Sequence, residues 1–240
     1  MKVRFLSAGD RALVVEFGDR VDRVLSGDVL RLNAAIRSEP LTGVIETVPT
    51  FRSLMVYFDP LVTSRAELER AVQGLLHRER NARIAVTQWR IPVCYEDEFA
   101  PDLAEVVRLS GLPPGEVAEL HSGTRYHVYM LGFLPGFPYM GDLPPELALP
   151  RRADPRLRVP AGSISIATTL TAIYPYESPG GWHLIGATPI RLFDIERPNP
   201  ALLAPGDAVI FEPIDRARYE EVRKAVENRS YEAVSEPIGA

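Results

Sequence analysis

The pattern of apolar residues changes near residue 88, and this change constrains the fold more than any other feature of the chain. Before it, short apolar runs alternate with longer segments of helical periodicity. After it, β-branched and aromatic residues dominate, and Pro-Gly turns divide them. We therefore predict a small α+β sandwich domain over residues 1–88, followed by an all-β barrel domain with flanking helices over residues 89–240.

The first half of the chain is predicted to follow the order β-α-β-α-β. Apolar residues at helical spacing predict a helix over 21–37. A second helix should begin after Ser64, because Glu67 stands three residues later and completes a capping box. The strands of this half are expected at 11–17, 53–58 and 83–86.

The second half is predicted to be rich in short strands. Pro-Gly signals at 178–182 and 204–207 predict tight turns, the first of type II with Gly180 at its third position. The strands are expected at 125–131, 163–176, 183–194 and 208–214, and the helices at 101–110, 114–121 and 216–228.

Residues 129–141, YMLGFLPGFPYMG, combine glycines, prolines and aromatic rings without any charge. The run is too short and too broken to span a membrane, and it lacks the Gly-x4-Gly-Lys-[Ser/Thr] pattern of a phosphate loop. We predict an ordered loop rather than a strand, which shapes a barrel rim. Gly132, Gly136 or Gly141 should adopt backbone angles that favour glycine.

Charge and composition exclude several classes of protein. The net charge of -5 is opposite to the basic character of most nucleic-acid-binding chains. The single cysteine, Cys94, excludes an internal disulfide. The N-terminal segment lacks a signal-peptide core, and the uncharged run 159–176 is a poor membrane helix. We expect a cytoplasmic protein that binds neither nucleic acid nor membrane.

Lysine occurs only at Lys2 and Lys224, near the two ends of the sequence. Enzymes that use ATP commonly place a lysine on its phosphates, and neither of these residues is convincingly placed for that role. If the reaction uses ATP, we expect the nucleotide to bind elsewhere or on another chain.

Three stretches of the second half stand out: GFLPGFPY (132–139), RVPAGSISIA (158–167) and YPYESPGGWHLIGATPIRLFD (174–194). Together with matching segments in the first half, they resemble the allophanate hydrolase subunit 1 family, which includes the B component of 5-oxoprolinase and KipI-like kinase inhibitors. The resemblance implies that the second domain is a cyclophilin-like barrel.

The resemblance also implies a role. The chain would be the B component of an ATP-dependent 5-oxoprolinase-type complex, in which 5-oxoproline is phosphorylated before its ring is opened. Its partners would be a second subunit of the allophanate hydrolase subunit 2 type and a lactam-opening third component, with ATP bound through the assembled complex. The alternative is a KipI-like regulator that binds a sensor histidine kinase and inhibits it.

The sequence departs from the family pattern at four positions. Thr168, Leu170 and Ala172 stand where the family usually has Gly, Gln and Gly, and Ala187 stands in place of Arg. These changes remove an amide and a cation from what we interpret as one region of the substrate site. We therefore expect weakened binding of 5-oxoproline, or a different ligand.

His121 is the candidate acid or base, and the alternative is a histidine that caps a helix end. His127 lies inside a predicted strand and is expected to pack, whereas His183 is expected to have a surface role. Neither combines with His121 into a metal site. Five aromatic candidates either line a pocket or pack in a core: Phe133, Phe137, Tyr139, Tyr174 and Trp182. The arginines of the basic run 150–158 either bind an anion or pair with acids. The candidate substrate-binding residues are Phe133, Phe137, Arg156, Arg158, Leu170, Tyr174, Ala187 and Thr188.

Overall fold

The computed structural model describes residues 3–78 and 86–238. The chain forms two compact units, which divide between Val86 and Thr87. Each unit has its own hydrophobic core. No helix among the described residues is long and apolar enough to cross a membrane.

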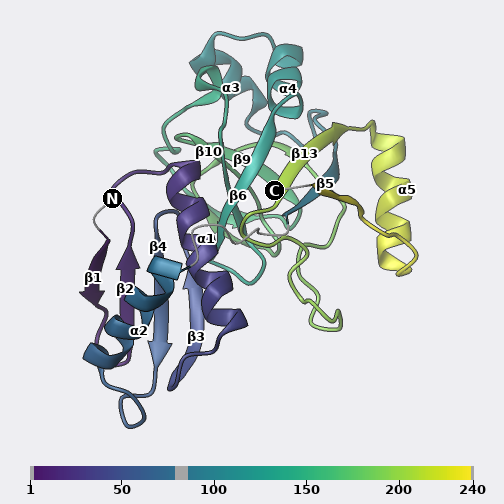
Figure 1. Ribbon diagram of the computed structural model, residues 1–240. Coiled ribbons are helices and arrows are strands. Elements are labelled where there is room, and N and C mark those ends of the chain that lie inside the picture. Colours follow the sequence, from purple (N-terminus) through teal and green to yellow (C-terminus); the bar gives the residue numbers. More distant parts are fainter. Residues whose placement is uncertain (1–2, 79–85, 239–240) are drawn as a thin grey trace. The chain divides into compact units, whose positions relative to one another are not determined.

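The first unit is a four-stranded antiparallel sheet in the order β1-β2-β4-β3, with two helices on one face (Figure 1). Alternate residues of the central strands, such as Leu13 and Leu54, are fully buried in one core with apolar residues of both helices. The elements are β1 (Arg4–Ser7), β2 (Ala12–Glu16), α1 (Arg23–Ser38), β3 (Val44–Pro49), β4 (Ser53–Phe58) and α2 (Arg65–Arg78).

Side-chain caps explain where the two helices of this unit begin. The Asp22 carboxylate accepts hydrogen bonds from the backbone N–H of Val24 and Leu25, so α1 starts two residues later than predicted. The predicted capping box is confirmed, because the Ser64 N–H donates to the Glu67 carboxylate at 2.8 Å and the Glu67 N–H donates to the Ser64 hydroxyl at 3.3 Å. The sequence pattern missed β1 and β3, and the strand predicted at 83–86 lies outside the described residues except for Val86.

The second unit contains an eight-stranded sheet in the order β12-β9-β10-β7-β6-β13-β5-β14 and a two-stranded ribbon of β8 and β11. Its strands are β5 (Val86–Val93), β6 (Arg125–Leu131), β7 (Pro138–Gly141), β8 (Arg156–Val159), β9 (Ser163–Ala167), β10 (Leu170–Ile173), β11 (Ser178–Gly180), β12 (His183–Ala187), β13 (Ala208–Pro213) and β14 (Val234–Ile238). Its helices are α3 (Leu103–Ser110), α4 (Pro114–Ser122), the 3-10 turn η1 (Pro145–Leu147) and α5 (Arg216–Glu227).

This unit is mixed α/β: its strands and flanking helices agree with the prediction, whereas the all-β cyclophilin-like barrel is not confirmed. Figure 1 shows α3 and α4 together at one end of the unit and α5 beside β13 and β5. Closure into a barrel is not confirmed, because the described ladder ends at β12 and β14. One isolated bridge, between Cys94 and Ala187, links the residue after β5 to the end of β12.

Three local predictions in this unit need correction. The segment 163–176 is a hairpin of two strands rather than one strand. Gly180 lies in β11 and lacks the positive φ of a type II turn. The run 129–141 is largely two strands, β6 and β7, joined by a short loop, although Gly136 has the expected positive φ of 76°.

Other predictions in this unit are confirmed. The strand predicted at 125–131 is β6, and the helix predicted at 216–228 is α5 without its last residue. The turn at 204–207 forms as expected: the Asp207 N–H donates to the Ala204 carbonyl, and Gly206 has a φ of 101°.

Candidate functional site

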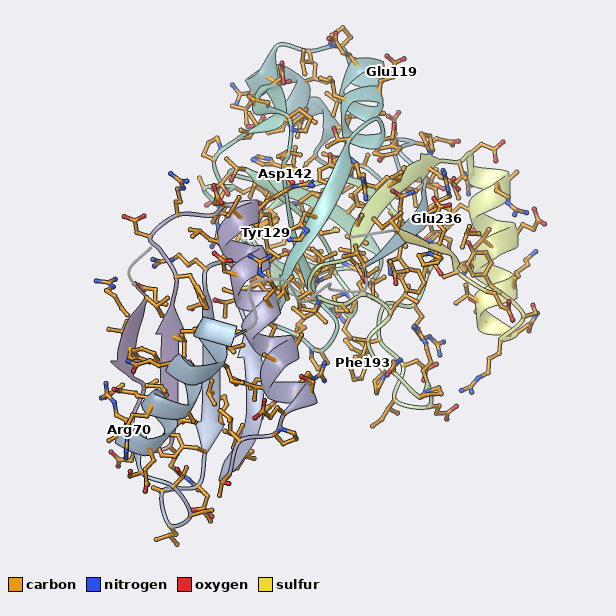
Figure 2. All side chains as sticks on the ribbon, viewed as in Figure 1. Arg70, Glu119, Tyr129, Asp142, Phe193 and Glu236 are labelled. Carbon is orange, nitrogen blue, oxygen red and sulfur yellow. The ribbon has the colours of Figure 1, made fainter. Side chains whose placement is uncertain are left out.

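Two of the motif stretches, 158–167 and 174–194, meet at one cleft of about 500 Å³ in the second unit, which we call the motif cleft. Figure 2 labels Phe193, which lies in the long connection between β12 and β13 and contributes to the cleft wall. The opposite wall comes from α5. The lining residues are Ala161, Gly162, Pro175, Tyr176, Thr188, Pro189, Ile190, Arg191, Phe193, Asp194, Ile195, Arg223, Val226 and Glu227.

Backbone hydrogen bonds fix the floor of the motif cleft. The Gly162 N–H donates to the Tyr174 carbonyl at 2.7 Å, and the Thr188 N–H donates to the Gly162 carbonyl at 2.8 Å. Gly162 has a φ of +82°, and a Cβ atom there would lie 2.3 Å from the Thr188 carbonyl oxygen. Only glycine permits this approach, so Gly162 holds the stretches 158–167 and 174–194 together.

The loop between β6 and β7 packs against the segment that walls the cleft. A Cβ atom on Gly136 would lie 2.8 Å from the Phe193 Cβ atom. Phe133 in the same loop is 61% exposed although its ring meets Phe137 edge to face. Its φ of 70° is an outlier for a bulky residue, and such strain is concentrated at functional sites. With Tyr176 and Ile195, which are also exposed, Phe133 adds to the exposed apolar surface of this unit.

A second cavity of about 290 Å³ shares Ile190, Arg191, Asp194 and Val226 with the motif cleft, and we call it the Arg197 cavity. Two ion pairs lie in its wall. Arg191 is 3.5 Å from Asp194, and Arg229 pairs with Glu196. The remaining lining residues are Arg197, Leu202, Tyr231 and Ala233.

The basic run 150–158 is mostly held by acids. Asp102 is 3% exposed and receives a bidentate hydrogen bond from Arg156, at 2.6 and 2.7 Å, and a 2.6 Å bond from Arg152. The Leu184 N–H donates to the same carboxylate at 2.7 Å. We call these four residues the Asp102 cluster, and it ties α3, the basic run and β12 together. Arg158 forms only an exposed pair with Glu177.

His183 lies beside the Asp102 cluster and is 3% exposed. Its Nε2 donates to the Pro150 carbonyl at 2.9 Å, and its Nδ1 has no partner in the described structure. The prediction of a surface role for this histidine is therefore wrong. His127 meets the Tyr129 ring edge to face, in keeping with the packed role expected for it.

His121 is fully buried, and its ring stacks on Phe211 with centroids 4.6 Å apart. The Thr171 hydroxyl donates to the Ser165 carbonyl, so it accepts from His121 Nε2, and Nδ1 accepts from the Tyr95 hydroxyl. Burial lowers the pKa of His121 to about 3. This geometry makes His121 a neutral core residue, neither an exposed acid or base nor a cap.

Four aromatic candidates form one packed group. Phe137 contacts Tyr139, Tyr174 and Trp182 with ring centroids 5.0, 5.1 and 6.4 Å apart. Burial raises the pKa of Tyr174 to about 12, so its hydroxyl stays neutral. Leu170 packs against the same group. These rings follow the core-packing alternative rather than lining the motif cleft.

The sheet register separates the two main departures from the family pattern. Leu170 lies opposite Ala167 at one end of β9, and Ala187 lies opposite Ser163 at the other end. Four residues of strand span about 13 Å. The interpretation that Leu170 and Ala187 mark one region of the site is therefore wrong.

The predicted site residues are thus distributed over several places. Thr188 lines the motif cleft, Arg156 belongs to the Asp102 cluster, and Ala187 is buried beside Cys94. Sequence reasoning missed Asp102, Arg191, Asp194 and Arg197. For Asp102 the one local signal is its position before a helix, because its partners lie at least 50 residues away in sequence. No group of His, Cys, Asp or Glu in the described residues could hold a metal ion.

Comparisons with known proteins agree with this architecture. Residues 3–203 match the family described as carboxyltransferase domain, subdomain C and D. The chain is 38% identical over 231 residues to the B component of 5-oxoprolinase from Bacillus subtilis, covering 90% of this chain and 95% of that protein. It is 40% identical over 216 residues to the B component of 5-oxoprolinase from Escherichia coli O157:H7, covering 88% of this chain and 96% of that protein.

A solved structure shows the same similarity. The crystal structure of a protein called TTHA0988 superimposes with a TM-score of 0.77 at 38% identity. The match covers 85% of this chain but only 40% of that protein, so the chain spans less than half the length of TTHA0988. The resemblance read from the motifs is confirmed, and the chain belongs to the carboxyltransferase domain, subdomain C and D family that includes the B component of 5-oxoprolinase.

Proposed function

We propose that this chain is the B component of an ATP-dependent 5-oxoprolinase-type complex. The similarity to two proteins of that name over nearly their whole length carries the proposal. The kinase-regulator alternative gains no support from these relatives.

The chain supplies part of a site rather than a complete one. Lys2 and Lys224 are its only lysines and it has no phosphate loop, so ATP binds through the assembled complex. The second subunit, of the allophanate hydrolase subunit 2 type, provides the remaining groups, and a third component opens the ring. The two compact units act as two domains of a cytoplasmic subunit, the second of them related to cyclophilin-like barrels.

The motif cleft is the part of the chain best suited to the substrate. Its floor is fixed by Gly162 and Thr188, and it carries the cation of Arg191. In the proposed reaction the lactam oxygen attacks the γ-phosphorus of ATP, a P–O bond forms and ADP leaves. Hydrogen-bond donors placed before the reaction stabilise the charge that develops during such a transfer.

The test is to purify the chain with its second subunit and third component and to measure ADP and glutamate formed from 5-oxoproline. We expect turnover by the assembled complex and none by the chain alone. Arg191→Gln should slow the complex, whereas Arg108→Gln, which removes an exposed ion pair with Glu105, should not. Steady turnover by the single chain, or a full complex inert toward 5-oxoproline, would contradict the proposal.

A further inference from the structure

Arg197 projects from a tight turn into the wall of the Arg197 cavity. The Arg197 N–H donates to the Asp194 carbonyl at 3.1 Å, and the Glu196 N–H donates to the Asp194 side chain at 3.1 Å. These bonds fix the base of the side chain, so its guanidinium is held in place by the fold.

The Arg197 guanidinium forms no ion pair with the described residues, and Asp194 acts on its charge only at longer range. Its Nη2 donates to the Arg191 carbonyl, and no carboxylate of the described residues lies within 4.0 Å of it. A guanidinium carries five N–H donors, so most of them remain available. The side chain is half-buried, and burial lowers the pKa of Arg197 because the charged form loses water.

The other charges of the cavity cancel in pairs. Arg191 pairs with Asp194, and Arg229 pairs with Glu196, which leaves one positive charge, that of Arg197. A half-buried cation without a partner is unfavourable, and an anion in the cavity would compensate it. The single surplus charge suits a monoanion better than a phosphate or a dicarboxylate.

The cavity also fits the uncharged part of such a ligand. Ile190, Leu202 and Val226 contribute apolar surface beside the guanidinium. A volume of about 290 Å³ is at the lower end of the range for ligand sites, which favours a small molecule. Carboxylate is the planar anion that a guanidinium binds through two parallel hydrogen bonds.

We infer that the Arg197 cavity binds the carboxylate of a small monocarboxylate ligand through the Arg197 guanidinium. If the function proposed above holds, on which this identification of the ligand rests, the ligand is 5-oxoproline. Its ring would lie toward the motif cleft, because the two cavities share Ile190 and Arg191.

The test follows the Arg197 Nε–H resonance of the full chain by NMR, assigned through its loss in Arg197→Gln. Titration with 5-oxoproline and with acetate should shift this resonance, whereas 2-pyrrolidone, which lacks the carboxylate, should not. Calorimetry should show 5-oxoproline binding weakened about tenfold or more by Arg197→Gln. The control Arg108→Gln should change the affinity by less than about twofold, because its side chain is exposed and paired with Glu105.

An Arg197 resonance that responds to neither carboxylate, or responds only to inorganic phosphate, would overturn the inference. Unchanged 5-oxoproline affinity in Arg197→Gln would overturn it as well. The proposed function is judged separately by turnover of the assembled complex. The complex could be inert toward 5-oxoproline while acetate still shifts the Arg197 resonance. That result would support the carboxylate site and contradict 5-oxoproline as the substrate.

Discussion

The Asp102 cluster and the Arg197 cavity are both rich in arginine, but they treat charge in opposite ways. Asp102 is buried and every strong donor around it is within 2.7 Å, so the protein neutralises its own charges. Arg197 is half-buried and has no acid within 4.0 Å in the described chain. Charges that are satisfied internally hold the fold together, whereas an unsatisfied one leaves an interaction for a ligand to make.

The largest expected effect tests whether the Asp102 cluster stabilises the fold. Asp102→Asn removes the charge that compensates Arg152 and Arg156 and leaves two cations facing a neutral group. We expect the free energy of unfolding to fall by about 3–5 kcal/mol, measured by urea denaturation. Glu177→Gln breaks only the exposed pair with Arg158 and should cost less than about 1 kcal/mol. Equal effects would remove the distinction between the two kinds of pair.

The next effect concerns pH and tests whether His121, like the Asp102 cluster, has a structural role. Its pKa is lowered to about 3 in the folded state, against an ordinary value of 6.5. Below pH 6.5 the unfolded chain therefore binds a proton that the folded chain does not, and stability falls as the pH falls. Tyr95 and Tyr126, which contact the ring, stay neutral because burial raises the pKa of both.

The measurement is urea denaturation of the native chain and of His121→Gln between pH 7 and pH 4. Relative to the variant, the native chain should lose up to about 1.4 kcal/mol per pH unit, or about 3 kcal/mol by pH 4. Parallel stability curves for the two proteins would show that His121 is protonated as easily in the folded chain as in the unfolded one.

A smaller effect tests Phe133, where the fold does not compensate an unfavourable conformation. Phe133 combines a φ of 70° with an exposed ring, so its backbone strain is not offset by burial. Phe133→Gly and Phe133→Ala both remove the ring, but only Gly relieves the strain. We expect the Gly variant to be more stable than the Ala variant by about 1 kcal/mol in thermal denaturation. An Ala variant of equal or greater stability would argue that the loop conformation is not strained.

The smallest expected effect is a coupling energy near zero. Leu170→Gln and Ala187→Arg restore the usual family residues at opposite ends of β9. Because the sites are separated by about 13 Å along β9 and lie on the strands at its two sides, their effects on stability should add within about 0.5 kcal/mol in a double-mutant cycle. A coupling above about 1 kcal/mol would mean that the two positions act on a shared structure after all.

Local sequence patterns predicted the features that depend on neighbouring residues. The Ser64 capping box, the strand β6 and the Pro-Gly turn before β13 all depend on residues only a few positions apart. The sequence pattern missed the strands β1 and β3 of the first unit. Their side chains are mostly exposed or half-buried, which weakens the alternation of apolar and polar residues. Local patterns therefore predicted best those features that depend on interactions between neighbouring residues.

The candidate site was harder to predict because its contacts cross the sequence. His121 meets Thr171 fifty residues away, and Asp102 meets Leu184 at a separation of 82. Arg197 stands in a polar turn that resembles any solvated loop until α5 is placed beside it. The motif stretches identified the family, yet only the tertiary structure shows that two of them, 158–167 and 174–194, share one cleft.

The parallel pairing of β13 with β5 also affects how the chain is made. In the sheet β5 lies between β13 and β14, so during synthesis it leaves the ribosome more than a hundred residues before either neighbour. Until then Ile91 and Val93, which are fully buried in the finished unit, have no strand on either side. The sheet can be completed only after residues 208–213 and 234–238 have been made, and a nascent chain with such an open apolar strand is a natural client for a chaperone.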